Sequence, residues 1–187
     1  MSQVLRKVMT PEEFLAWEAA QELKWEFDGF QPVAMVGATL VHAAIQGNII
    51  TALNNRLRGK PCRPYGSDVK VQIGPKYRYP DALVSCVPVI PGVTVAADPV
   101  VIFEVLSEST AKTDRTTKLM EYCSLPSVQR CVLLEQDRAF ATVVARTETG
   151  WSFGMLDAHG TLAMPEIGVE VPMAELYDGL DLALLDL

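Results

Sequence analysis

The spacing of apolar residues predicts two helices in the first third of the chain. From residue 41 to 57 apolar side chains recur at helical spacing, and Gly59 with Pro61 ends the pattern. An earlier helix is expected over residues 11–22, because Thr10 is followed by a proline and two glutamates. A hydroxyl that caps the first turn, a proline at the first helical position and nearby acids are typical of a helix start.

Between these two helices the pattern predicts a β-hairpin. Residues 24–27 and 31–36 contain aromatic and branched apolar side chains, as strands do, and they flank Asp28-Gly29. This dipeptide favours the positive backbone angles of tight hairpin turns. Glu26 is therefore expected on a short strand just before a turn.

The rest of the chain alternates apolar runs with turn residues. A helix is expected over residues 111–124, begun by Ser109 or Thr110 and ended before Pro126. The run 99–107 is apolar on both faces apart from one acid, which is typical of a central strand. Other strands are expected at 65–73, 80–87, 129–135, 139–147 and 151–157, with a strand-like and then briefly helical extension over 161–187. These elements predict a single α/β (α+β) domain over residues 1–187, in which helices flank one mixed central β-sheet.

The composition is that of a globular protein and narrows the choice of partners. The 187 residues are 49% hydrophobic and 21% charged, with a formal net charge of −7. This negative net charge argues against nonspecific electrostatic binding to DNA or to an anionic membrane. A locally basic cleft is compatible with it. The chain start lacks the apolar core of a signal peptide, and no window approaches the roughly 20 apolar residues of a membrane helix. We expect a cytoplasmic protein that does not bind membranes.

Several common active-site classes have no motif in this sequence. It contains no GxGxxG, P-loop, GxSxG or HExxH, and its only histidines are His42 and His159. The spacing of the four cysteines is too irregular for a CxxC metal site. We expect all four to be reduced, buried thiols, at Cys62, Cys86, Cys123 and Cys131.

Two acids on predicted strands are candidates for chemistry. Glu104 is the odd residue in the most apolar strand, and a buried carboxylate costs roughly several kcal/mol unless a cation, a metal or hydrogen bonds compensate it. An internal arginine or lysine partner is the structural alternative. Asp81 follows Pro80 and is either a turn residue or the second acid of a pair at one end of the sheet. Paired carboxylates are ligands that suit Mg²⁺ or Mn²⁺.

The helix expected after this strand carries further polar groups. Asp114, Lys118 and Tyr122 follow one another at i, i+4 spacing. On its own this pattern indicates a surface ion pair that contributes about 0.3–0.5 kcal/mol, with a tyrosine in the core. His42 lies at the start of the longest helix, beside its apolar stripe, so it either packs there or joins a site with the carboxylates.

These residues together resemble one known family. The order of motifs is similar to that of the Uma-type family of restriction endonucleases, a branch of the PD-(D/E)XK nuclease superfamily, over about residues 9–150. The matching segments are Tyr79-Pro80-Asp81, the stretch 100–110 (VVIFEVLSEST), Asp114-Arg115 with Lys118 and Tyr122, the start Met9 to Phe14, the hairpin Trp25 to Gly29, and His42.

The resemblance implies a restriction-endonuclease-like core and a role for each matching residue. It implies Asp81 and Glu104 as ligands of Mg²⁺ (or Mn²⁺), Glu26 as a third acid of the site and Lys118 as the positive group near the attacking water. The superfamily usually places this lysine two residues after the second acid, where this chain has Leu106. Lys70, on a neighbouring predicted strand, is therefore a competing candidate, and His42 and Tyr122 are accessory ones.

The chemistry implied is metal-dependent hydrolysis of DNA phosphodiesters, in which the ion polarises the phosphate and lowers the pKa of a bound water. A symmetric homodimer would cut both strands. Seven basic residues between 56 and 78 form either a phosphate-contacting surface or a solvated face. The alternative functions are a non-catalytic DNA-binding or assembly protein with the same fold, and a metal-dependent hydrolase of small phosphoesters.

Overall fold

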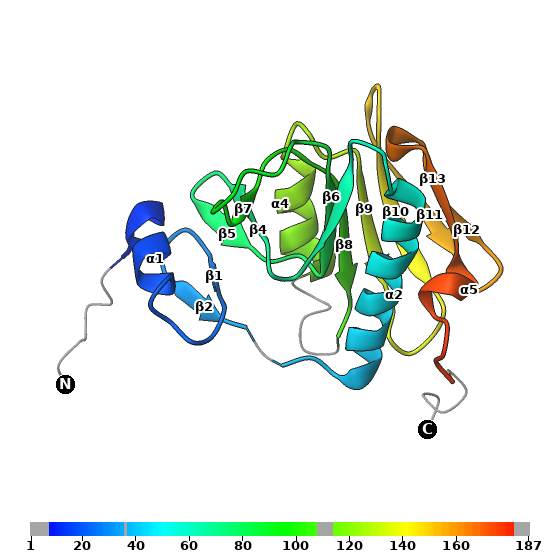
Figure 1. Cartoon of the computed structure of the whole chain (residues 1–187), viewed down its shortest axis with the longest axis horizontal. Coiled ribbons are helices and arrows are strands. Elements are labelled where there is room, and N and C mark those ends of the chain that lie inside the picture. Colours follow the sequence, from blue (N-terminus) through cyan, green and yellow to red (C-terminus); the bar gives the residue numbers. More distant parts are fainter. Residues whose placement is uncertain (1–7, 36, 108–113, 182–187) are drawn as a thin grey trace.

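The computed structural model describes residues 8–35, 37–107 and 114–181 (Figure 1).

The first helix forms where its sequence signals predict it. Helix α1 (Pro11–Glu18) begins with a capping box in which the Thr10 hydroxyl accepts from the Glu13 backbone and the Glu13 carboxylate accepts from the Thr10 backbone. The helix ends four residues earlier than expected, because the backbone N–H groups of Ala20 and Gln21 bond three residues back and close tight turns.

A mixed sheet forms the centre of the molecule. Its order is β11 (Gly150–Leu156), β10 (Ala141–Thr147), β9 (Arg130–Leu134), β8 (Pro99–Val105), β6 (Ala82–Ser85) and β3 (Arg63–Gly66). Strands β8 and β9 are parallel, and the other neighbours in this sheet are antiparallel. β8 is buried along almost its whole length, as its apolar sequence predicts.

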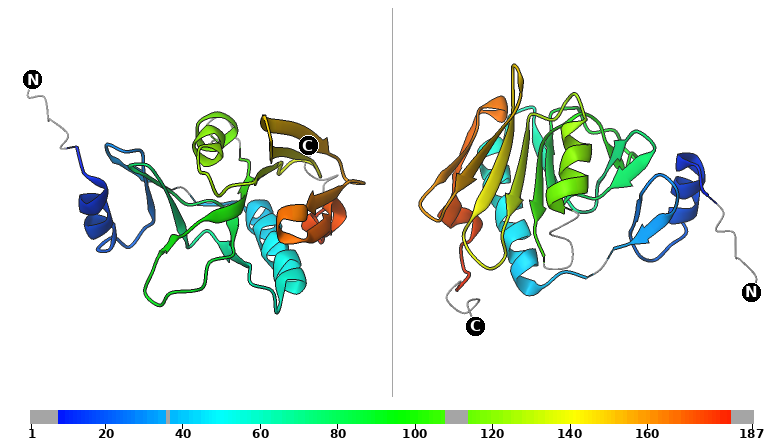
Figure 2. Two further views of the ribbon diagram at one scale, coloured as in Figure 1. Left: turned by 90° about the horizontal axis from the view of Figure 1, so that it is seen from above. Right: turned by 180° about the vertical axis from the view of Figure 1, so that it is seen from behind.

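Helices cover both faces of this sheet. Helix α2 (Leu40–Leu57) and helix α4 (Leu119–Cys123) lie on opposite sides of the strands, as the view from above shows (Figure 2). Side chains of β8 alternate accordingly: Phe103 packs in the cluster formed with α2, whereas Ile102 packs in the cluster formed with α4. Glu104 follows the alternation of Ile102 and therefore belongs to the α4 face.

A second sheet attaches the N-terminal segment. Its order is β2 (Pro32–Ala34), β1 (Trp25–Phe27), β5 (Lys76–Arg78), β4 (Lys70–Ile73) and β7 (Val95–Ala96). Phe14 of α1 stacks on Phe27 and Tyr77, with ring centroids 4.8 and 5.7 Å apart. The segment therefore has its own small aromatic core, to one side of the central sheet (Figure 1).

The C-terminal part adds a third small sheet. Strand β12 (Thr161–Met164), the 3-10 turn η2 (Pro165–Ile167), strand β13 (Val169–Pro172) and helix α5 (Met173–Leu176) follow one another. Gly168 joins the turn to β13 at φ 62°, a left-handed conformation that glycine adopts without strain. Leu162, Met164 and Val171 pack in the same apolar cluster as α2, so this extension covers the α2 side of the central sheet.

The α+β class with mixed strands is confirmed, but three details of the prediction are wrong. Three sheets replace the expected single sheet in the described part of the chain. The expected strand 65–73 is two strands, β3 and β4, in different sheets, because Ser67 and Asp68 turn the chain between them. The expected helix 111–124 is a π-helical turn η1 (Asp114–Lys118) followed by α4, while the expected caps Ser109 and Thr110 lie outside the described residues.

The expectation that all four cysteines are reduced is also wrong. Cys62 and Cys86 form a disulfide, whereas Cys123 and Cys131 are free thiols. The pairing follows from the register, since Arg63 lies opposite Ser85 and the two cysteines are the next residues outward. None of the helices in the described part of the chain has the length and apolar character needed to cross a bilayer.

Candidate active site

Glu104 is a buried acid held by two side chains from the neighbouring helical segment. It lies on β8, and only 3% of its surface is exposed. The Tyr122 hydroxyl donates a hydrogen bond of 2.6 Å to Glu104 Oε1, and Lys118 Nζ lies 3.8 Å from the same oxygen. Burial and the nearby Glu104 charge raise the pKa of Tyr122 well above its ordinary value, so this hydroxyl stays a donor at neutral pH.

Lys118 joins Glu104 to a second buried acid, Glu26. Its ammonium lies 3.0 Å from Glu26 Oε1, which also accepts a hydrogen bond of 3.2 Å from the backbone N–H of Tyr79. The other oxygen of Glu26 accepts from Arg78 Nη1 at 3.1 Å. The acid on the hairpin strand β1 is therefore linked to the acid on β8 through one lysine.

Arg78 and Glu121 extend this cluster, and the sequence analysis missed both. Arg78 donates to both oxygens of Glu121, at 2.7 and 3.1 Å, and Lys76 donates to Glu121 Oε1 at 2.6 Å. Burial opposes the charge on Arg78, but hydrogen bonds and charges from Glu121 and Glu26 raise its pKa. Burial likewise disfavours the charged form of Glu121, and its two basic partners outweigh this and lower its pKa. No local pattern in the sequence distinguishes either residue from a surface charge.

Asp81 lies just before β6, next to β8. Its Oδ2 accepts a hydrogen bond of 2.7 Å from the backbone N–H of Val105, which follows Glu104 directly. Its Oδ1 lies 3.2 Å from His42 Nε2, at the start of α2. Because Ala82 pairs with Phe103, Asp81 and Glu104 occupy the next position along the two antiparallel strands. Asp81 and Glu104 therefore lie at the same end of the central sheet.

Lys70, the competing candidate lysine, lies in a different buried cluster. Its ammonium is 2.5 Å from Glu18 Oε2, and the Tyr79 hydroxyl donates to Glu18 Oε1 at 2.6 Å. Both Glu18 and Lys70 are buried. The contacts of Lys70 therefore connect α1 to the second sheet, and Lys118 is the lysine that lies beside Glu104.

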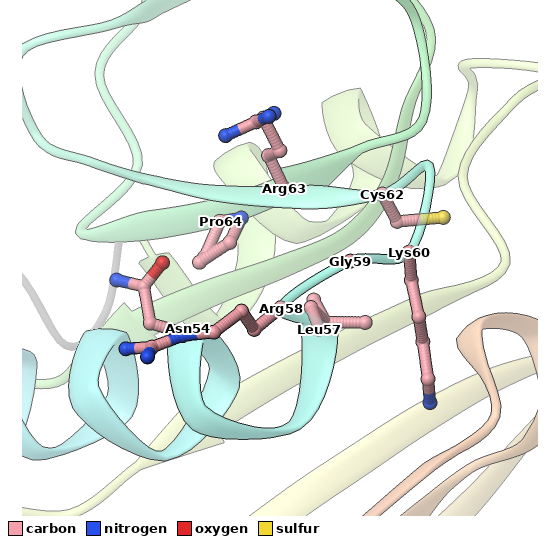
Figure 3. Close-up of a pocket in the computed structure, with 8 residues that line it drawn as sticks. All are labelled: Asn54, Leu57, Arg58, Gly59, Lys60, Cys62, Arg63 and Pro64. Carbon is pink, nitrogen blue, oxygen red and sulfur yellow. The ribbon is translucent and has the colours of Figure 1, made fainter.

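The seven basic residues between 56 and 78 do not form one surface. Four pair with acids: Arg56 with Glu175, Lys70 with Glu18, Lys76 with Glu121, and Arg78 with Glu26 and Glu121. The other three, Arg58, Lys60 and Arg63, line a pocket of about 590 Å³ at the C-terminal end of α2 (Figure 3). Because His42 lies at the opposite end of α2, this pocket is separate from the acid pair.

The donor set fits a hard divalent cation that keeps part of its coordination for water and substrate. Among the described residues, no group of three or more His, Cys, Asp or Glu side chains is placed to hold a metal alone. Mg²⁺, however, is commonly bound through one or two carboxylates together with waters and substrate phosphates. Asp81 and Glu104 provide two such carboxylates on adjacent strands. Two carboxylates at one end of the sheet, with a lysine near one of them, are compatible with this kind of binding.

The central sheet with a helix on each face, and with Asp81 and Glu104 at one end, defines an α+β protein. A crystal structure described as "a putative nuclease belonging to DUF820" from Anabaena variabilis is similar to this chain, with a TM-score of 0.75 at 17% identity. The match covers 90% of this chain and 97% of that one. This likeness confirms the fold class.

The chain belongs to the Uma2 family, described as "Putative restriction endonuclease", whose family model matches residues 11–164. The family predicted from the sequence motifs is therefore confirmed. The Synechocystis sp. protein slr1290 is 31% identical over 176 residues, which covers 92% of this chain and 93% of that protein. The roles expected for Glu26, Asp81, Glu104 and Lys118 stay predictions at this point.

Proposed function

We propose that this protein is a divalent-metal-dependent endonuclease that hydrolyses phosphodiester bonds of DNA. The observation that carries the proposal is the juxtaposition of Glu104 with Lys118 and, on the neighbouring strand, Asp81. A purely structural ion pair needs one acid and one base. Here a second carboxylate lies at the same end of the sheet, and membership of a family described as "Putative restriction endonuclease" supports the same function.

Each residue of the site has a task in this proposal. Asp81 and Glu104 would hold Mg²⁺ or Mn²⁺, which supplies a polarised phosphate and a more acidic water when it is bound. Lys118 stabilises the negative charge that develops on the phosphate. Glu26 holds the Lys118 ammonium, Arg78 holds the Glu26 carboxylate, and Tyr122 orients the Glu104 carboxylate. His42 fixes Asp81 from the α2 side.

The test is cleavage of supercoiled plasmid and of single-stranded DNA with Mg²⁺ or Mn²⁺, and with EDTA as the metal-free control. We expect Asp81→Asn and Glu104→Gln to lose at least about 100-fold in rate, because each removes a charge that the metal needs. Glu170→Gln changes an exposed acid on β13 and is the matched control that keeps wild-type activity. Mn²⁺ titration by calorimetry should show weaker binding in both site variants.

Three results would contradict the proposal. Equal cleavage in wild type and in both site variants would place the activity elsewhere or in a contaminant. DNA binding without cleavage under any metal would indicate a non-catalytic DNA-binding or assembly protein. Hydrolysis of a small phosphodiester, but of neither DNA substrate, would indicate a hydrolase of small phosphoesters.

We propose a symmetric homodimer as the active form, because two related sites cut both strands of a duplex readily. Sedimentation equilibrium measures the mass in solution directly. The homodimer would be contradicted if the protein is a monomer in solution and its specific rate of plasmid linearisation does not change with protein concentration.

A further inference from the structure

The pocket at the C-terminal end of α2 contains bases but no acid. It has a volume of about 590 Å³ and is lined by the last turn of α2, the turn that follows it and the start of β3 (Figure 3). Its lining includes three cations, whereas the whole chain has 23 acids against 16 lysines and arginines. This pocket is therefore positively charged in a protein whose net charge is −7.

Structural contacts account for two of the bases in this region, Arg56 and Lys60. Arg56 donates to the Ala52 carbonyl at 3.2 Å and to the two oxygens of Glu175, at 2.7 and 2.6 Å. Lys60 donates to the Gly168 carbonyl at 3.1 Å. A base that bonds a backbone carbonyl or pairs with an acid contributes to the fold and needs no ligand.

Arg58 and Arg63 have no such contacts. Both residues are exposed, and within the part of the chain that the structure describes no carboxylate or carbonyl oxygen bonds either guanidinium. Asn54 and Arg58 lie together at the end of the helix and Arg63 lies across from them on β3, whereas Lys60 points the other way (Figure 3). The two guanidinium groups are therefore accessible to an anion that enters the pocket.

The backbone fixes the points from which these two arginines extend. Gly59 turns the chain directly after Arg58 at φ 78°, a conformation that glycine adopts without strain. The disulfide of Cys62 with Cys86, together with the pairing of β3 with β6, holds the backbone of Arg63. Because both attachment points are fixed, an anion has to order only two side chains and no loop, which lowers the entropic cost of binding.

We propose that this pocket binds a ligand with two or more adjacent phosphate groups, held by Arg58 and Arg63. A guanidinium presents paired N–H donors that match a phosphate in two parallel hydrogen bonds. Two such groups favour a ligand with two phosphates over a single phosphate ion, and the Asn54 amide provides a further donor beside Arg58.

Two sources present this chemistry, a free oligophosphate and the backbone of DNA. The DNA source rests on the proposed function, whereas the oligophosphate source does not. Because the pocket is separate from Asp81 and Glu104, binding here requires neither a metal ion nor cleavage. Failure of the nuclease proposal and failure of this one are therefore distinguishable.

The first test is calorimetric titration of the full-length protein with pyrophosphate and, separately, with orthophosphate. EDTA is present throughout, so that no metal can hold an anion at the acid pair. We expect pyrophosphate to bind more tightly than orthophosphate. Arg58→Gln and Arg63→Gln should each weaken pyrophosphate binding about tenfold. Arg138→Gln removes the same charge from an exposed arginine between β9 and β10 and should bind as wild type does.

The second test uses a short DNA duplex, also in EDTA, to distinguish the two sources. If DNA occupies the pocket, it displaces pyrophosphate, and the salt dependence of its affinity decreases by about one phosphate contact in each variant of Arg58 and Arg63. If the ligand is a free oligophosphate, these two variants bind DNA as wild type does while their affinity for pyrophosphate falls. Either result supports a phosphate site in this pocket.

Circular dichroism checks that all variants are folded, and three results would overturn the proposal. The first is no pyrophosphate binding to wild type. The second is equal pyrophosphate binding by wild type, Arg58→Gln and Arg63→Gln. The third is loss of pyrophosphate binding in Lys118→Met alone, which would place the anion at the candidate active site instead.

Discussion

Two buried clusters in this protein have the same three residue types but different surroundings. In one, Lys70 and the Tyr79 hydroxyl both contact Glu18, at 2.5 and 2.6 Å. In the other, Lys118 and the Tyr122 hydroxyl contact Glu104, at 3.8 and 2.6 Å. The first lysine is tightly bound to one acid, whereas Lys118 lies closer to Glu26 than to Glu104.

The difference shows why a buried Lys–Glu pair does not by itself identify an active site. Lys70 neutralises Glu18, and the pair fastens α1 to the second sheet. Lys118 lies between two carboxylates, at the end of the sheet where Asp81 adds a third acid. A lysine that lies between several acids can bind a phosphate while the acids keep other partners. A lysine that is the only cation beside one buried acid cannot bind a phosphate without leaving that acid buried and unpaired.

The largest expected effect is on the stability of the first cluster. Lys70→Met leaves the Glu18 carboxylate buried without its cation, so we expect a loss of about 3–5 kcal/mol in the free energy of unfolding. Lys118→Met should cost less, because Arg78 and the Tyr79 backbone still hold Glu26. Urea denaturation measures both. A double variant, Lys70→Met with Glu18→Gln, should recover part of the loss. Equal stability of all these variants would contradict the different roles assigned to the two lysines.

The next largest effect is expected on DNA cleavage, and it concerns the cluster of Lys118 and Glu104. Lys118→Met should slow metal-dependent cleavage about 100-fold. This factor corresponds to a loss of about 2.7 kcal/mol in transition-state stabilisation. Lys70→Met should keep the wild-type rate at a temperature where it is folded, because its ammonium contacts only the Glu18 cluster. The measurement is the initial rate on supercoiled plasmid at saturating Mg²⁺. A larger loss in the Lys70 variant than in the Lys118 variant would exchange the roles assigned to the two lysines.

The smallest effect concerns the two tyrosines and depends on pH. Burial and the neighbouring glutamates raise the pKa of both Tyr79 and Tyr122. The folded protein therefore keeps these protons more tightly than the unfolded chain. Their contribution is fully present below the ordinary tyrosine pKa of about 10 and is lost as pH rises above it.

Phenylalanine variants test this pH dependence. Tyr79→Phe and Tyr122→Phe each remove one hydrogen bond to a carboxylate and should cost about 1.5–3 kcal/mol at pH 8. Between pH 9 and 11 their stability should fall less steeply than that of wild type. Tyr77 and Tyr177 also have raised pKa values, so a residual decline is expected in both variants. Parallel curves for all three proteins would show that neither hydroxyl titrates with unfolding.

Local sequence signals predicted the elements that are regular along the chain. The capping residues of α1, the apolar periodicity of α2 and the two-sided apolar run of β8 each depend on neighbours in sequence. The division into several sheets depends on which strands pair across long separations, and no local signal gives that. β5 was missed because three residues between turns are too short to show a pattern.

The site was predicted in the same uneven way. Glu104 was found from physics alone, because a lone acid in an apolar strand requires a partner. Glu26 and Lys118 came from family resemblance, since their proximity arises only when the hairpin and η1 meet. Arg78 and Glu121 resemble ordinary surface charges in the sequence, and only the structure shows that Arg78 is buried on β5 and bonded to Glu121 of α4.

The short pairing of β1 with β5 has a thermodynamic consequence for ligand binding. The register pairs them at Phe27 and Tyr77, and Glu26 of β1 adds contacts to Arg78 of β5, to the Tyr79 backbone and to Lys118 of η1. In the proposed function, a phosphate bound at Lys118 would compete with Glu26 for the same ammonium. Occupancy of the site and attachment of residues 9–34 would then be linked equilibria, and each would shift the other by the same coupling free energy. We therefore expect amide hydrogen exchange in β1 to change when a ligand binds at Lys118.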